Sequence, residues 1–128
     1  MKRLAALAIV IAAPAAADVV EVSGCHHLEP SGVTQLIECQ VFNASDTPIA
    51  ELSYGVRVGQ TDRSVPWYEY SMDGRHPFIH AVRGGIEPGE TVPVPFLTAQ
   101  IHERANRDKL TVKVVIHEAM DLDGNPIE

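Results

Sequence analysis

The sequence predicts an all-β protein: a single antiparallel β-sandwich of about seven strands that follows an N-terminal signal peptide. Several segments alternate apolar and polar residues with a period of two, which is typical of half-buried strands. Turn residues separate these segments roughly every eight to twelve positions, and hardly any stretch shows helical periodicity. Because each alternating segment has one polar face, the pattern favours an antiparallel sandwich over a buried parallel sheet.

The N-terminus has the three parts of a cleavable secretory signal. Met1-Lys2-Arg3 is a short basic stretch, an apolar run extends from Leu4 to Ala17, and Ala15-Ala16-Ala17 provides a small-residue cleavage site. The run is shorter than the about 20 apolar residues of a spanning helix, and it lacks the polar face of an amphipathic one. We therefore expect a signal peptide over residues 1–17, one domain without a membrane span over residues 18–128, and a periplasmic or secreted location.

A competing interpretation is lipid anchoring at Cys25. Val22-Ser23-Gly24-Cys25 resembles a bacterial lipobox, in which the cysteine is lipidated after cleavage. Asp18 and Glu21 stand between the apolar run and this cysteine, where charges would disturb its presentation at the membrane. Lipidation would also leave Cys39 unpaired, so the sequence disfavours a lipoprotein.

Charge and cysteine content narrow the partners and the compartment. The chain has 10 Lys and Arg against 17 Asp and Glu, a net charge of −7, and loss of the signal would remove two positive charges. Surfaces that bind phosphates need the opposite sign, so nucleic acid and anionic membranes are not expected partners. Cys25 and Cys39 predict one disulfide in an exported protein, worth about 3 kcal/mol for a loop of this size. Two thiols without metal-ligand spacing do not predict a zinc site.

The first half of the domain contains three predicted strands. A weak one covers Asp18 to Gly24, and a stronger one covers Val33 to Asn43 after a turn at Glu29 to Gly32. The cysteines lie symmetrically about that turn, but Cys25 falls on the polar side of its strand, so we expect a β-bulge or a strand end there. The clearest strand, Ile49 to Val58, keeps a period of two that no helix would keep. Its apolar face consists of Ala50, Leu52, Tyr54, Val56 and Val58.

The second half of the domain is less regular. Short strands are predicted at Phe78 to Val82 and at Val92 to Phe96, where two prolines remove hydrogen-bond donors and place the strand at a sheet edge. Thr98 could cap a short helix that extends to about Asn106. Leu110 to Met120 is the last strong strand. Its inward face is predicted to consist of Leu110, Val112, Val114 and Ile116.

Two stretches resemble a recurring pattern of bacterial exported immunoglobulin-like and fibronectin-III-like domains. In IECQVFNASDTPI, Ile37 to Ile49, a strand ends in Asn43, a Ser/Asp/Pro loop follows, and the next strand carries Tyr54. IEPGET, Ile86 to Thr91, is similar to the I-x-P-G-E-T turn that opens a later strand in such domains. The chain lacks the terminal F-x-L-Y-D signature of one such family. The resemblance implies an immunoglobulin-like sandwich and carries no activity with it.

Histidine is the residue type that most invites a metal site, because copper and zinc are bound by imidazole in many exported proteins. His76 and His80 are four residues apart, a spacing that converges on one ion only in a helix. Pro77 and Phe78 favour extended chain instead, in which the two histidines would lie about 13 Å apart. We therefore expect no cofactor, and we keep metal handling by scattered histidines as the alternative function.

The sequence shows no catalytic motif. It contains no G-x-S-x-G elbow and no glycine-rich phosphate loop, and its two thiols are expected to be oxidised. Asp121 to Asn125 resembles the start of a calcium loop, but Pro126 stands where that loop requires glycine. We therefore do not expect an enzyme.

The best binding candidate is an aromatic segment with arginines nearby. It consists of Trp67, Tyr68 and Tyr70, near Arg63 and Arg75. Aromatic and Arg residues dominate the hot spots of protein interfaces. The competing interpretation is that Trp67 or Tyr70 fills the sandwich core. The leading hypothesis is a non-catalytic module that binds another protein or an envelope component.

Overall fold

The computed structural model describes residues 19–28 and 35–128, and it confirms an all-β fold of two antiparallel sheets. The predicted signal peptide and the predicted turn at residues 29–32 lie outside the described residues. No helix in the described ranges is long and apolar enough to cross a membrane. The strands are β1 (Val20–Leu28), β2 (Gln35–Asn43), β3 (Ile49–Gln60), β4 (Tyr68–Tyr70), β5 (Phe78–Ile86), β6 (Thr91–Thr98) and β7 (Leu110–Met120).

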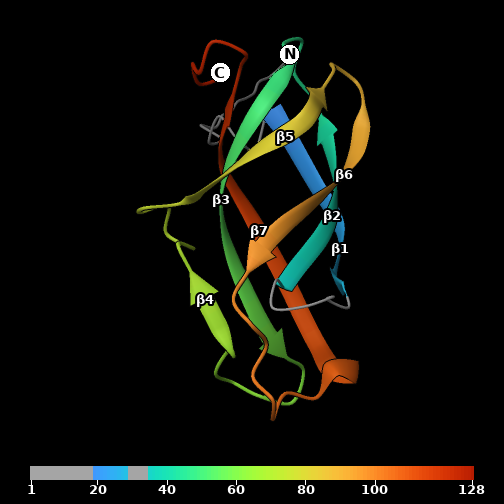
Figure 1. Ribbon diagram of the computed structural model, residues 1–128, viewed down its shortest axis with the longest axis vertical. Coiled ribbons are helices and arrows are strands. Elements are labelled where there is room, and N and C mark those ends of the chain that lie inside the picture. The colour runs from blue at the N-terminus through green and yellow to red at the C-terminus, as the bar shows by residue number, and fades with distance from the viewer. Residues whose placement is uncertain (1–18, 29–34) are drawn as a thin grey trace, which may run out of the picture.

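The two sheets form the layers of a sandwich that is compatible with an immunoglobulin-like fold (Figure 1). One sheet has the strand order β1-β2-β6. In the other, β3 is central: β7 pairs along one edge of it from Glu51 to Gln60. On the other edge, β5 pairs with the first half of β3 and β4 with the second half. The end of β3, the turn before β4 and the segment between β6 and β7 therefore meet at one end of the sandwich (Figure 1).

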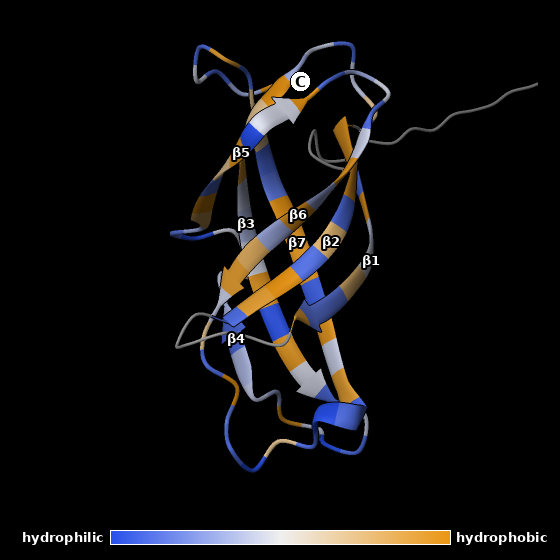
Figure 2. Ribbon diagram, turned by 45° about the vertical axis from the view of Figure 1, so that its right-hand side comes forward, coloured by the Kyte–Doolittle hydropathy of each residue, from blue (hydrophilic) through white to orange (hydrophobic). Residues whose placement is uncertain are grey.

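Alternation along the strands places most of the core as predicted (Figure 2). The exceptions are Ala50, where the register shift at the start of β3 buries Ile49 instead, and Leu110, Val112 and Ile116 of β7, which are only partly buried. In β2, Ile37, Cys39 and Val41 are fully buried, and in β3 the buried apolar face runs from Leu52 to Val58. The central contact between the sheets is Tyr54 of β3, whose ring lies 4.8 Å from that of Phe96 in β6, centroid to centroid. The Tyr54 hydroxyl donates a 3.0 Å hydrogen bond to the Leu97 carbonyl, so its one polar atom is satisfied inside the sandwich.

Burial of Tyr54 predicts a loss of stability at alkaline pH. Desolvation raises the pKa of Tyr54 from 10.0 to about 12, because the phenolate would have to form in the core. The unfolded chain ionises at the lower pH, so the free energy of unfolding should fall by about 1.4 kcal/mol per pH unit through this interval. Burial raises the pKa of Tyr68 as well, so Tyr68 also lowers stability at alkaline pH. The contribution of Tyr54 is therefore the part of the pH-dependent loss of unfolding free energy that the wild type shows and Tyr54→Phe does not. Urea unfolding of both proteins from about pH 9 to about pH 12, a range that contains both pKa values, measures this contribution. If the free energy of unfolding fell equally with pH in both proteins, the burial of this phenol would be contradicted.

A β-bulge brings the two cysteines together, one of the two arrangements that the sequence predicted at Cys25. The β1–β2 register shifts between Ser23 and His26, and Gly24 adopts a positive φ of 61° that a residue with a side chain rarely accepts. The shift turns Cys25 toward Cys39 in β2, and the predicted disulfide between them is confirmed. Since such bonds persist in oxidising compartments, the disulfide indicates an extracytoplasmic environment.

Loss of this disulfide should destabilise the domain by about 3 kcal/mol, because it closes a loop over a sequence separation of 14 residues. The double variant Cys25→Ala/Cys39→Ala should show this difference in urea unfolding, and reduction of the wild-type protein should give nearly the same loss. Wild-type stability in the reduced protein would contradict the pairing.

Two further predictions about the second half have different outcomes. The proline-bearing strand β6 lies at a sheet edge, as predicted, and within the described part of the chain it pairs only with β2. The predicted helix from Thr98 to Asn106 is wrong: this segment consists of turns and is followed only by a 3₁₀ turn, Arg107–Lys109. Side chains take backbone donors that a helix would need, since His102 Nδ1 accepts from the Arg104 amide and Gln60 Oε1 from the Asn106 amide.

The two stretches that resemble exported immunoglobulin-like domains meet at Asn43, the last residue of β2. The Asn43 side chain is fully buried and donates to the carbonyls of Thr47 and Ile86, at 2.9 and 2.8 Å. Its Oδ1 accepts from both the amide and the hydroxyl of Ser45. The Asn43 backbone also bonds to Gly89 and Glu90 in the turn before β6. One buried asparagine thus joins the turn after β2 to the turn between β5 and β6.

Candidate protein-binding surface

The three aromatic residues of the predicted binding segment do not form one patch. Tyr68 is partly buried against the core. Tyr70 packs on Phe78, with ring centroids 4.4 Å apart, and its hydroxyl donates to the His76 carbonyl. Only Trp67 lies at the end of the sandwich where β3 ends and the segment between β6 and β7 passes, and it is half-buried and outside the core cluster. The binding candidate therefore narrows to Trp67 and to what surrounds it.

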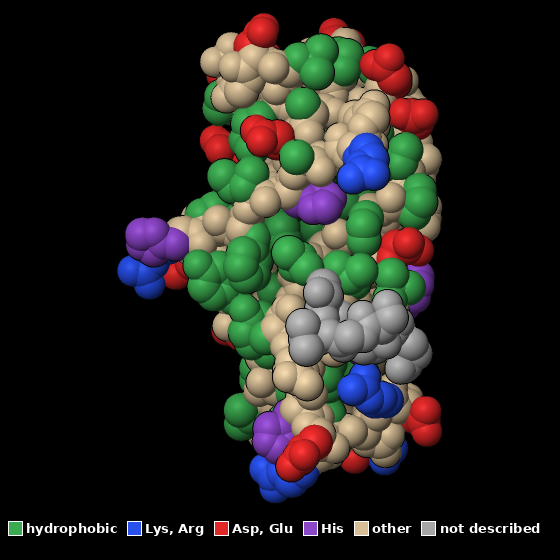
Figure 3. Space-filling view, viewed as in Figure 1, with side chains coloured by type: hydrophobic (Ala, Val, Ile, Leu, Met, Phe, Trp, Pro, Cys, Tyr) green, Lys and Arg blue, Asp and Glu red, His purple; other side chains and the backbone are tan. Residues whose placement is uncertain are grey.

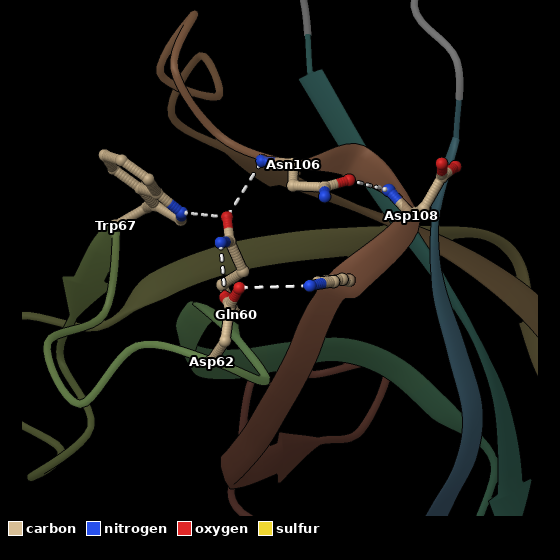
Figure 4. Close-up of polar contacts among 6 residues, drawn as sticks. Gln60, Asp62, Trp67, Asn106 and Asp108 are labelled. Carbon is tan, nitrogen blue, oxygen red and sulfur yellow. Dashed lines mark hydrogen bonds and ion pairs between the residues drawn. The ribbon is translucent and has the colours of Figure 1, made fainter.

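Gln60, the last residue of β3, fixes the position of Trp67. The Trp67 amide donates to the Val58 carbonyl, and its indole Nε1 donates a 2.9 Å hydrogen bond to Gln60 Oε1. The same oxygen accepts a 2.8 Å hydrogen bond from the Asn106 amide, which belongs to the segment between β6 and β7. Figure 4 shows how Gln60 connects the two segments while the indole ring points away from the strands.

Asp62 and Lys109 reinforce the same junction. Gln60 Nε2 donates to Asp62 Oδ1 at 2.6 Å, and Lys109 Nζ lies 3.2 Å from Asp62 Oδ2 (Figure 4). These hydrogen bonds hold the pKa of Asp62 below its usual value, so the carboxylate stays ionised. On the β6–β7 side, Ile101 is buried and anchors that segment to the core. The surface around Trp67 is thus held in one arrangement by contacts between two loops that are far apart in sequence.

The Trp67 ring is surrounded by cationic and imidazole side chains. The guanidinium of Arg63 lies over the ring, with Cζ 3.7 Å from the centroid, and that of Arg104 lies at 5.9 Å. The His102 ring stacks on the indole at 5.0 Å with an angle of 17° between the planes. Cations over an indole are attracted by its quadrupole, so Arg63 and Arg104 stiffen the site while they keep their charge at the surface.

Neither Arg63 nor Arg104 forms an ion pair among the described residues, whereas Arg57, Arg75 and Lys109 each do. Lys, Arg and His side chains gather at this lower end of the molecule, beside acidic side chains (Figure 3). Among the same described residues Arg83, Arg107 and Lys113 form no ion pair either, so what distinguishes Arg63 and Arg104 is that both guanidiniums lie beside the one tryptophan of the chain. Such a surface fits a partner group that is acidic and has an apolar face.

The histidines are spread over the domain. His76 precedes β5 and has a positive φ of 51°, so it does not share a strand with His80 as the sequence analysis assumed. Burial lowers the pKa of His80, whose ring centroid lies 5.8 Å from that of Phe96. Within residues 19–28 and 35–128, no group of three or more His, Cys, Asp or Glu side chains is placed to hold a metal ion.

The described residues show no hydrogen bond between a Ser or Thr hydroxyl and a His side chain, the contact that activates a nucleophile in hydrolases. His117 instead donates to the Ser71 carbonyl, and His27 contacts the Gln35 side chain.

Sequence reasoning found Trp67 and Arg63 and missed Gln60, His102 and Arg104. These three come from the end of β3 and from a segment that was predicted to be helical. A tryptophan seven residues after a glutamine at the end of a strand is the one local signal that could have suggested Gln60.

Comparison of the chain with known protein families, with characterised proteins and with solved structures finds no match.

Proposed function

We propose that this protein is a non-catalytic module of the periplasm, or of the extracellular space, that binds another protein through the surface around Trp67. The observation that carries the proposal is the indole ring held by Gln60 and flanked by the unpaired guanidiniums of Arg63 and Arg104. Tryptophan and arginine are the residues most enriched among interface hot spots, and positioning by β-strand ends lowers the entropy cost of binding.

The compartment is supported by two separate features. The sequence has the parts of a signal peptide, and the two cysteines of the domain form a disulfide of the kind that oxidising compartments preserve. We further propose that the domain is an immunoglobulin-like module of the bacterial exported type. The contacts of Asn43 support this, because they join the two stretches on which the resemblance depends.

The test is affinity capture from envelope extract with the purified protein as bait. Trp67→Ala and Arg104→Ala should each lower recovery of a specific partner by about tenfold, the effect of removing a hot-spot side chain. Leu122→Ala is the matched control, because Leu122 is 79% exposed at the opposite end of the sandwich. Equal recovery by the Trp67→Ala variant and the wild type would reject this surface as the contact.

A further inference from the structure

Two cations face each other on the outer face of the sheet that β3 and β7 form. In the antiparallel ladder Arg57 of β3 lies directly opposite Lys113 of β7. The residues on either side of Arg57, Val56 and Val58, are fully buried, so Arg57 points to the outer face and its ladder partner Lys113 shares that face. Like charges at directly opposite positions repel each other, so this pair destabilises the folded chain.

The repulsion is only partly offset by a neighbouring carboxylate. On the other side of β3, Glu69 of β4 lies opposite Arg57, and the two side chains form an ion pair. Lys113 forms no ion pair with any other residue that the structure describes. This row across the sheet therefore has two cations and one anion, and one positive charge is left without a partner.

A pocket of about 380 Å³ adjoins this row of charges. Gly59 lies two residues after Arg57 on the same face of β3, and its lack of a side chain leaves the floor of the pocket open. A Cβ at Gly59 would lie 2.8 Å from the hydroxyl oxygen of Thr111 in β7. The charged and hydroxyl-bearing side chains that line the pocket are Arg57, Arg63, Glu69, Ser64 and Thr111.

Arg63 connects this pocket to the surface around Trp67. Its guanidinium lies over the Trp67 ring, with Cζ 3.7 Å from the centroid, and it has no ion pair within residues 19–28 and 35–128. The nearby carboxylate of Asp62 is already paired with Lys109. With the row across the sheet, three cations thus stand against the one carboxylate of Glu69, in a chain whose net charge is −7.

The spacing of these cations fits an extended acidic segment. Alternate residues of a strand lie about 7 Å apart on one face. The cations follow the same direction along β3 and into the loop after it, with Gly59 between Arg57 and Arg63. In an extended segment with acidic residues at alternate positions, one carboxylate can lie at Arg57 and Lys113 and the next at Arg63.

We propose that this pocket binds an extended segment of the partner protein that carries Asp or Glu at alternate positions. The inference rests on the proposed function, because Arg63 belongs both to the pocket and to the surface around Trp67, and it names the part of the partner that binds. The planar guanidiniums favour carboxylates because each can donate two parallel hydrogen bonds to one carboxylate.

The experiment is a ¹H–¹⁵N NMR titration of the purified protein, at low ionic strength, with an acetylated and amidated peptide that carries two glutamates separated by one serine. The amides of Gly59 and Thr111 should shift together and saturate, with a dissociation constant on the order of 1 mM, since the ion pairs are exposed to solvent. The same peptide with glutamine at both positions should bind about fivefold more weakly or less tightly still, and so should inorganic phosphate at equal ionic strength. Added salt should weaken binding of the glutamate peptide.

Lys113→Glu separates a loss of binding from a loss of folding. The reversal places an anion opposite Arg57, so the variant should be at least as stable as the wild type in urea unfolding. The same reversal should raise the dissociation constant of the glutamate peptide by about tenfold, because an attraction becomes a repulsion and Arg57 gains a competing partner. Arg63→Gln should raise it by about fivefold.

Arg83→Glu is the matched control for charge reversal. Arg83 is an exposed cation of β5 without an ion pair in the described part of the chain, and β5 pairs with the half of β3 that does not contain Arg57. The variant should change the dissociation constant by less than about twofold, since the distant charge is screened.

Three results would each overturn the proposal: no saturable shift with the glutamate peptide, equal or tighter binding of the glutamine peptide or of phosphate, or wild-type affinity in Lys113→Glu. The proposed function is judged separately, by capture of a partner with Trp67→Ala. The pocket can therefore fail while the surface around Trp67 remains the contact, and the capture experiment can fail while the pocket binds the peptide.

Discussion

Asn43→Ala should lower the free energy of unfolding by about 4 kcal/mol, because the variant loses four side-chain hydrogen bonds of about 1 kcal/mol each in a buried site. The Ile86 carbonyl would lose its side-chain donor, and the turn after β2 would lose the acceptor that holds Ser45. Since Asn43 is the contact between two turns, the entry into β6 should loosen together with the start of β3.

Urea unfolding followed by far-UV circular dichroism measures this effect. Ser45→Ala is the graded control. It removes the hydroxyl and its three hydrogen bonds, to Asn43 Oδ1, to the Thr47 carbonyl and from the Thr47 amide, but it leaves both Asn43 donors in place. It should therefore cost less, about 2 to 3 kcal/mol at this partly buried site. Asn43→Asp keeps the acceptor and loses both donors, so its stability should lie near that of Asn43→Ala. If Asn43→Ala were no less stable than Ser45→Ala, the asparagine would not be the junction that its contacts indicate.

Gly55→Ala should be at least as damaging, at about 4 kcal/mol or more, because overpacking against backbone has no side chain that can move aside. A Cβ on Gly55 would lie under 3.0 Å from backbone atoms of both Tyr70 and Ser71. To make room, Ser71 would have to move away from β3, and its carbonyl would lose the 2.7 Å hydrogen bond from His117 Nε2. The turn after β4 would then detach from the sheet.

Gly59→Ala provides the matched control in the same strand. Its Cβ would lie 2.8 Å from the Thr111 hydroxyl, a side-chain atom that can rotate away. We expect this variant to lose less than about 1 kcal/mol in the same unfolding measurement, as substitutions outside tight backbone contacts usually do. Similar losses for the two glycines would contradict the close approach of Ser71 to β3.

Much of the fold could be predicted from local sequence pattern. The alternation in β2 and β3 fixes which side chains face the core, and this information is contained within a few adjacent residues. Cys25 falls on the polar side of its strand and Cys39 on the apolar side of the next, which predicted a bulge or a strand end at Cys25; the structure has the bulge, at Gly24. Two prolines placed β6 at an edge because a residue without an N–H cannot pair on both sides.

The segment from Thr98 to Asn106 could not be predicted in this way. The segment has helical spacing in its sequence, but in the structure the Asn106 amide donates to Gln60 Oε1 and the Arg104 amide donates to His102 Nδ1. Both competing contacts depend on side-chain positions in the folded chain rather than on periodicity. Tertiary hydrogen bonds therefore override a weak local preference.

The candidate site could likewise be predicted only in part from local sequence pattern. Composition alone identified Trp67 and Arg63, because hot-spot residue types are recognisable in a sequence. The partners that give the indole its orientation, Gln60, His102 and Arg104, come together only when the ends of β3 and β6 are placed at the same end of the sandwich. That placement depends on the pairing of strands far apart in the chain, which no local pattern specifies.

The most direct test of the binding proposal uses Trp67 as its own reporter, since the chain has one tryptophan. Protein labelled with 5-fluorotryptophan should give a single ¹⁹F resonance, and this resonance should shift or broaden as the captured partner is added. The change should saturate at the same partner concentration as binding measured independently by calorimetry. A fluorine signal that stays unchanged while calorimetry shows saturated binding would place the contact elsewhere on the domain and contradict the proposed function.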